Sequence, residues 1–188
     1  MGRTLVVFPS SDVAVAGIAI GAVTYYGCVA QRPHDGDATR VRLLNQGDRL
    51  EWGLDFGGIL PNEIVTRIDI EWAAQGSQSG ASDAQVGFRI AGADHLAAAR
   101  DMSAGYVVRT DPFQNNPATG IPWTRVELVA GGVHSVYLQG VMQNDAGYPR
   151  LSGYAVLLGL AKLPISITGR GRALRATGVS SAPRARRV

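Results

Sequence analysis

Apolar and polar side chains alternate along most of the chain after residue 40. Leu50, Trp52 and Leu54, for example, alternate with charged or small residues. Successive side chains of a strand point to opposite faces, so a period of two predicts strands that bury one face. The pattern predicts strands in the segments 49–56, 64–72, 86–90, 133–142 and 153–160.

The same alternation assigns the tryptophans to the core. In the segment 64–72, the apolar row begins at Ile64 and ends at Trp72, and we expect this row to face inward. Trp52 falls in the apolar row of its own strand. Exposed tryptophans would instead offer a platform on which sugars stack, but the core is the favoured interpretation.

Turn-forming residues separate the predicted strands. Gly, Asn, Asp and Pro are concentrated at 32–37, 45–48, 57–63, 75–83 and 143–149. Short strands joined by such turns predict an all-β fold, an antiparallel β-sandwich of the jelly-roll type with one or two short helices. One helical candidate is His95–Met102, and the other follows Trp123.

The segment after Trp123 carries the signals of a helix start. Thr124 is a good N-cap, and Glu127, three residues later, completes a capping box. Trp123 before the cap and Leu128 after it are placed to form a hydrophobic staple. Gly131 and the glycine after it are expected to end the helix after about two turns.

The N-terminal residues 1–23 are unusually apolar and precede the first clear turn. Their longest apolar run, Val13–Val23, is too short to cross a bilayer, which takes about 20 residues. Exposed apolar surface of this size indicates a partner. We therefore expect an apolar arm that packs into a neighbouring subunit through Val13, Val15, Ile18 and Ile20.

Residues 162–188 are predicted to form a second, arginine-rich arm beyond a sandwich domain at 24–161. The segment 170–188 has no acidic residue and holds six of the 18 basic ones, which leaves 12 basic and 15 acidic residues elsewhere. The basic character therefore belongs to the tail. We expect acidic surfaces of neighbouring subunits to bind it, with nucleic acid as the less favoured partner. Its arginines are Arg170, Arg172, Arg175, Arg184, Arg186 and Arg187.

Few residues have the spacing of a catalytic or metal site. Cys28 is the single cysteine and is expected to be buried. His34, His95 and His134 show no metal-ligand spacing. The Asp35–Asp37 turn could seat a calcium ion, although such a turn needs none. The sequence predicts no catalytic residue, no metal site and no cofactor, and an enzyme would require two carboxylates converging in a cleft.

Three segments together resemble a module of tailed-bacteriophage virion proteins. The first is the turn P-x-T-G-x-x-W-T at Pro117–Thr124, the second is Tyr26–Val41 with its D-G-D, and the third is Ser152–Leu158. The resemblance covers roughly 24–160. It departs from the family pattern at Arg40, where members often have tyrosine. It implies a jelly-roll-like β-sandwich in a head- or tail-associated structural component.

The predicted function is therefore assembly in a virion without catalysis. The expected partners are further copies of the chain and other virion proteins, and no membrane is implied. The alternative is a carbohydrate-binding module, because jelly rolls also carry lectin sites. Its contacts would come from loop aromatics and polar residues, namely Tyr106, Asp111, Asn144 and Tyr148.

Overall fold

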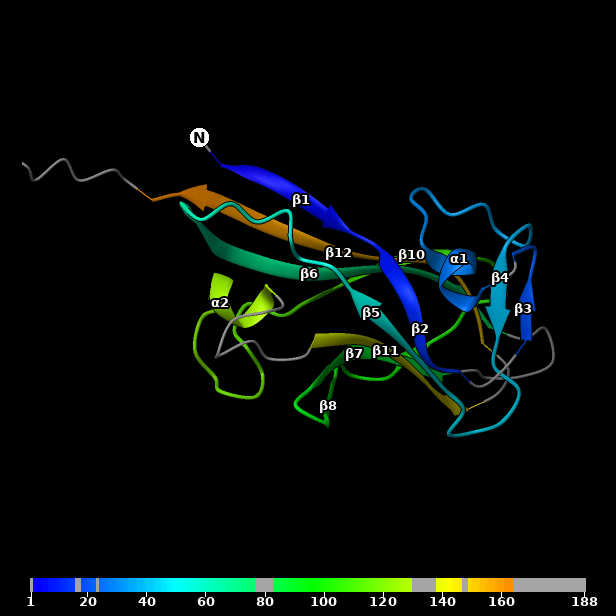
Figure 1. Cartoon of the computed structure of the whole chain (residues 1–188). Coiled ribbons are helices and arrows are strands. Elements are labelled where there is room, and N and C mark those ends of the chain that lie inside the picture. Colours follow the sequence, from blue (N-terminus) through cyan, green and yellow to red (C-terminus); the bar gives the residue numbers. More distant parts are fainter. Residues whose placement is uncertain are drawn as a thin grey trace, which may run out of the picture.

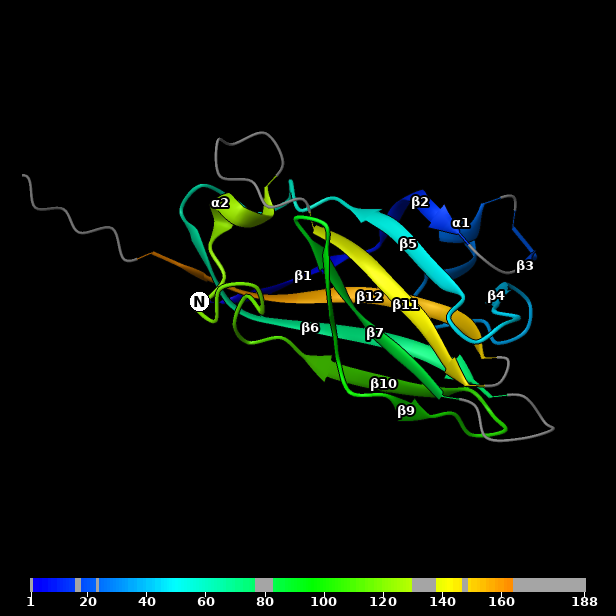
Figure 2. The same ribbon diagram turned by 90° about the horizontal axis from the view of Figure 1, so that it is seen from below.

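The chain folds as an antiparallel sandwich of two β-sheets, as the alternation predicts (Figure 1). The computed structural model describes residues 2–15, 18–22, 24–76, 83–129, 138–146 and 149–163. For Val15, Ile18, Ile20 and residues 138–146, only the backbone is described. Figure 2 shows the two layers from below, with the long strands of one sheet crossing those of the other.

Each sheet has six strands within the described residues. The first sheet has the order β10–β6–β12–β4–β3, with β1 also beside β12. Its strands are β1 (Arg3–Val7), β3 (Ile18–Ile20), β4 (Arg40–Arg42), β6 (Glu63–Gln75), β10 (Val107–Pro112) and β12 (Arg150–Lys162). The second sheet has the order β2–β5–β11–β7–β8, with β9 also beside β7. Its strands are β2 (Pro9–Val15), β5 (Arg49–Leu54), β7 (Asp83–Ile90), β8 (Ala93–Leu96), β9 (Arg100–Asp101) and β11 (Leu138–Ala146).

The core fills the space between the facing sides of the two sheets. Trp52 of β5 meets Tyr154 of β12 edge to face, with ring centroids 4.7 Å apart. The Tyr154 hydroxyl donates to the carbonyl of Gly87 at 3.2 Å and so ties the first sheet to the second. Trp72 and Trp123 are also buried. The core assignment of all three tryptophans is confirmed, and none of them forms an exposed platform.

A bulge in β6 changes which side chains face the core. Val65 and Arg67 pair with consecutive residues of β12, so Thr66 has no partner on that strand. Val65 is buried as a result, whereas Ile64 is 42% exposed. The prediction that Ile64 faces inward is therefore wrong. From Ile68 to Trp72 the alternation follows the predicted row.

The N-terminal segment belongs to the sandwich. β1 pairs with β12, the chain crosses between the sheets at Phe8, and β2 pairs with β5. β3 pairs with β4. The prediction of an arm at 1–23 is therefore wrong, because these strands complete the two sheets of their own domain. Of the four residues assigned to a neighbouring subunit, Val13 is exposed on β2, and Val15, Ile18 and Ile20 lie in β2 and β3.

Two short helices lie among the described residues, α1 (Tyr25–Val29) and α2 (Arg125–Leu128). The capping box of α2 is confirmed, since the Thr124 hydroxyl accepts from the Glu127 N–H at 3.3 Å and the Glu127 carboxylate accepts from the Thr124 N–H at 2.7 Å. Cys28 of α1 is fully buried, as predicted. Neither helix in the described part of the chain has the length and apolarity needed to cross a membrane.

The helix candidate His95–Met102 is wrong. Residues 95–96 belong to β8 and residues 100–101 belong to β9, and both strands pair with β7. Gly87 of β7 permits the close approach, because a Cβ there would lie 2.1 Å from the carbonyl oxygen of His95. Pairing with an existing strand therefore overrides the local helix propensity.

The strands of the sandwich run from Arg3 to Lys162 and so extend beyond the predicted limits of 24–161. β12 ends at Lys162, where the second arm was expected to begin. The six arginines of the predicted arm lie outside the described residues.

Two equally buried tryptophans give a test of the polar contacts in the core. The Nε1–H of Trp72 donates to the buried Asp111 at 2.8 Å, whereas the Nε1–H of Trp52 has no hydrogen-bond partner in the described part of the chain. Trp72→Phe should lower the free energy of unfolding by about 1–3 kcal/mol more than Trp52→Phe, because only the former leaves a buried partner unsatisfied. Urea unfolding measures both. Equal losses would show that the contact with Asp111 gives no net stabilisation.

The buried carboxylate of Glu63 should make stability sensitive to acid. Hydrogen bonds from Arg3, and then from the Leu60 N–H, lower the pKa of Glu63 from 4.5 to about 2. A lowered pKa in the folded state gives stabilisation that is complete above pH 4.5 and is lost as the pH falls towards 2. Glu63→Gln should therefore be less stable at neutral pH and lose less stability across this interval. Unfolding series at several pH values would show it, and a variant with the wild-type acid dependence would contradict it.

Candidate functional site

The outward face of the first sheet is lined by small side chains where β6 and β12 pair. Directly opposite residues of an antiparallel pair project to the same side. Ala73 lies opposite Gly153, and Glu71 lies opposite Ala155, all on the side away from the core. A floor of glycine and alanine leaves room for a ligand at this face.

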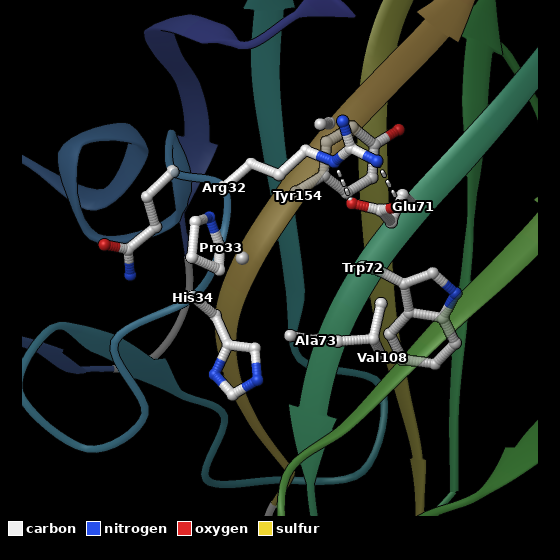
Figure 3. Close-up of a pocket in the computed structure, with 11 residues that line it drawn as sticks. Arg32, Pro33, His34, Glu71, Trp72, Ala73, Val108 and Tyr154 are labelled. Atoms are coloured by element: carbon white, nitrogen blue, oxygen red, sulfur yellow. Dashed lines mark hydrogen bonds and ion pairs between the residues drawn. The ribbon is translucent and has the colours of Figure 1, made fainter.

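A cavity of about 420 Å³ lies over this floor (Figure 3). One wall is residues 31–34 of the connector between α1 and β4, and Val108 of β10 lies on the opposite side. The floor is formed by 71–73 and 153–155. Trp72 and Tyr154 belong to this floor but direct their rings into the core. The volume is within the usual range for small-molecule sites.

The connector is held directly on β12. A Cβ at Gly153 would lie 3.2 Å from the Cβ of His34 and 3.4 Å from the carbonyl oxygen of Gln31, so glycine allows this contact. The side-chain amide nitrogen of Gln31 lies 2.5 Å from the Ser152 carbonyl oxygen and 2.8 Å from the Thr39 hydroxyl. The wall of the cavity is thus fixed to its floor by packing and by hydrogen bonds.

The two carboxylates of the D-G-D turn, in the same connector, accept hydrogen bonds from other groups of the protein. Burial alone would raise the pKa of Asp35, but hydrogen bonds from Thr39, Gln31 and Ser152 outweigh burial and lower it. Asp37 accepts from Tyr106 and pairs with two arginines, Arg40 and Arg150. The described residues contain no group of three or more potential metal ligands. Both carboxylates of the turn are thus engaged by protein groups, which gives the turn a structural role.

A forked ion pair between Arg32 and Glu71 lies in the cavity. The guanidinium of Arg32 donates from Nε to Glu71 and from its terminal nitrogen to the second carboxylate oxygen at 3.1 Å. The hydrogen bond, and then the charge of Glu71, raise the pKa of Arg32. Arginine has five N–H donors, and this fork uses two of them. The pair thus offers fixed donors and fixed acceptors side by side.

His34 lies at one end of the cavity against Tyr106. Their ring centroids are 5.3 Å apart, and the Gly36 N–H lies 3.2 Å from the Nδ1 of His34. That contact assigns the proton of the neutral ring to Nε2. Burial, and then the charge of Asp37, raise the pKa of Tyr106 above its ordinary value, so its hydroxyl remains a donor. His34 contributes a ring face and an N–H donor at this end.

Of the four residues predicted to contact a glycan, Tyr106 and Asp111 are the two whose side chains the structure describes. Tyr106 stacks against His34 beside the cavity. Asp111 is 2% exposed and is occupied by Trp72 and Arg100, so it is unavailable to a ligand. Asn144 lies in β11 with its side chain outside the description, and Tyr148 lies outside the described residues.

The Arg32–Glu71 pair of the cavity was not predicted from the sequence. Arg32 and Glu71 are 39 positions apart, and their pairing depends on the path of the connector across β12. One signal was present, namely small residues at alternate positions of the last strand, Gly153 and Ala155. Small side chains at alternate positions allow another segment to approach that face of the strand closely, as Gly153 allows for the connector.

No protein-family model and no curated protein matches the sequence. Among solved structures, the chain is similar to the C-terminal CBM6 of LamC, a marine laminarinase from Zobellia galactanivorans, at 11% identity, covering 83% of this chain and 99% of that one, with a TM-score of 0.44. It is also similar to a carbohydrate-binding module of Cellvibrio mixtus lichenase 5A in complex with cellotriose, at 12% identity, 85% and 98% coverage, and a TM-score of 0.40. A third is the CBM22-1–GH10 part of Clostridium thermocellum xylanase 10B with xylohexaose, at 7% identity, 85% and 27% coverage, and a TM-score of 0.45.

The predicted function of a virion structural protein finds no support in these comparisons: each of the three structures contains a carbohydrate-binding module, and none of them is a virion protein. The fold also removes the main physical reason for that prediction. The apolar N-terminal residues, which were expected to need a neighbouring subunit, form strands of the sandwich itself.

Proposed function

We propose that this chain is a non-catalytic carbohydrate-binding module that holds a glycan in the cavity on the outward face of the first sheet. The observation that supports it is the Arg32–Glu71 fork over a floor of small residues. A pyranose presents neighbouring hydroxyls, each a donor and an acceptor, around an apolar ring of C–H groups. The fork matches the hydroxyls, and the floor leaves room for the ring.

The arrangement of the carboxylates favours binding over hydrolysis. Glycoside hydrolysis requires one carboxyl that gives its proton to the leaving oxygen and a second that acts from the other side. Glu71 is held by Arg32, and the neighbouring Asp69 is held by Arg67. A carboxylate fixed in an arginine pair suits a constant acceptor, and it does not suit a free proton donor.

Neutral glycans are the first ligands to test, because the fork is balanced in charge. The probes are cellotriose and xylohexaose, the oligosaccharides named with two of the similar structures, and a panel of neutral polysaccharides. Isothermal titration and affinity electrophoresis with the full chain would detect binding. If no neutral glycan of the panel binds, the proposed function is wrong.

Glu71→Gln should weaken glycan binding about tenfold or more, which corresponds to about 1.4 kcal/mol, while the fold is retained. The substitution keeps the shape of the side chain and removes the charge that fixes Arg32. Arg32→Lys should also weaken binding, because lysine keeps the charge and loses the fork.

The matched control is Asp94→Asn on β8, which removes a carboxylate that pairs with Arg49 and Arg89 on the second sheet. It should leave the dissociation constant unchanged. Loss of affinity in the control alone, or in none of the three variants, would place the glycan site elsewhere on the molecule.

A further inference from the structure

A second cavity, of about 390 Å³, lies on the same face of the first sheet. Its lining comes from three neighbouring strands and from one residue of the connector. These residues are Thr4 and Val6 of β1, Arg67 and Asp69 of β6, Leu157 and Gly159 of β12, and Arg32. No part of the first cavity other than Arg32 is shared with it.

The two cavities follow one another along β12. The floor of the first contains Gly153 and Ala155, and the floor of the second contains Leu157 and Gly159. These are successive outward positions of one strand. At about 3.3 Å per residue, the floor from Gly153 to Gly159 is about 20 Å long. Arg32 reaches this floor from the side and lines both cavities, so it stands at their junction.

The second cavity also contains an arginine–carboxylate pair. Arg67 donates from its guanidinium to one oxygen of Asp69, whereas Arg32 donates to both oxygens of Glu71. Asp69 and Glu71 are alternate residues of β6, so the two pairs are about 7 Å apart along the strand. In both pairs the carboxylate is the more buried partner, at 4% and 19% exposure, and the arginine is the more exposed one, at 61% and 45%.

Two exposed arginines, each held by a less exposed carboxylate along one floor, fit a ligand whose units also repeat. We propose that the two cavities form one groove for a linear oligosaccharide, with Arg32 contacting the chain where it passes from one cavity to the other. This inference rests on the proposed glycan-binding function and specifies its ligand as a chain longer than a disaccharide. The N-terminal strand β1 then has a binding role, because Thr4 and Val6 form the wall of the second half.

The test is a length series with the full chain, from disaccharide to hexasaccharide, of the cello-, laminari- and xylo-oligosaccharides. The dissociation constant should fall by about tenfold or more between the disaccharide and the hexasaccharide, because only the longer chain contacts both arginines. Thr4→Ile places a larger aliphatic side chain, on which a sugar cannot stack, in the second cavity from an exposed position of an edge strand, where a β-branched residue is well tolerated. This variant should keep the wild-type affinity for the disaccharide and lose the gain with length.

Unchanged binding of the disaccharide shows that the variant is folded, and Ala93→Ile on β8 is the matched control, an exposed strand position on the second sheet. The control should keep the full gain with length. The inference is overturned if wild-type affinity does not rise with length, or if Thr4→Ile binds the hexasaccharide as the wild type does. If no oligosaccharide of any length binds, the glycan-binding function fails and the groove fails with it.

Discussion

The pairing of β6 with β12 is the interaction on which both the core and the groove depend. Each strand has 13 residues, and one antiparallel ladder joins them along most of the first sheet. The side chains of Trp72 and Tyr154 project from this ladder into the core, and those of Glu71 and Ala155 project from it into the groove. A slip of one residue would exchange the two faces, so the register fixes the fold and the site together.

The N-terminal strand extends this ladder and serves both faces in the same way. Val7 of β1 is buried in the core, whereas Thr4 lines the second cavity. Arg3 fastens the beginning of the strand to the buried carboxylate of Glu63, with a distance of 2.7 Å between Nε and Oε1. The segment is therefore apolar because it supplies one face of a strand, and a partner subunit is not needed to explain its composition.

Features that depend on neighbouring residues could be predicted from the sequence. The capping box of α2 involves Thr124 and Glu127 only, and the inward tryptophans follow from the alternation within single strands. Features that depend on distant partners could not. The bulge at Thr66 results from the way β6 pairs with β12. Parts of the segment His95–Met102 form strands because they pair with β7.

The groove is also a feature that depends on residues distant in the sequence. Nothing near Arg32 in the sequence indicates that it pairs with Glu71, because the connector that carries Arg32 must first cross β12. Asp111 shows the opposite case. Its position in a polar segment predicted an exposed carboxylate. In the structure, the indole of Trp72 and the guanidinium of Arg100 bind this carboxylate in the interior. The prediction from the sequence therefore placed the glycan contacts on loop residues and overlooked the outward face of a sheet.

The composition of the groove also determines where its binding free energy can come from. The large aromatic rings of the floor residues, Trp72 and Tyr154, are committed to the core, so the floor itself offers no stacking surface. Binding must then rely on the two arginine–carboxylate pairs and on the ring and N–H of His34, and a hydrogen bond to a charged group contributes only about 1.5–3 kcal/mol. The less exposed carboxylates keep each arginine in place before a ligand arrives, which limits the entropy lost on binding. A face built in this way gains affinity by engaging both arginines at once, and this favours an extended ligand over a single sugar.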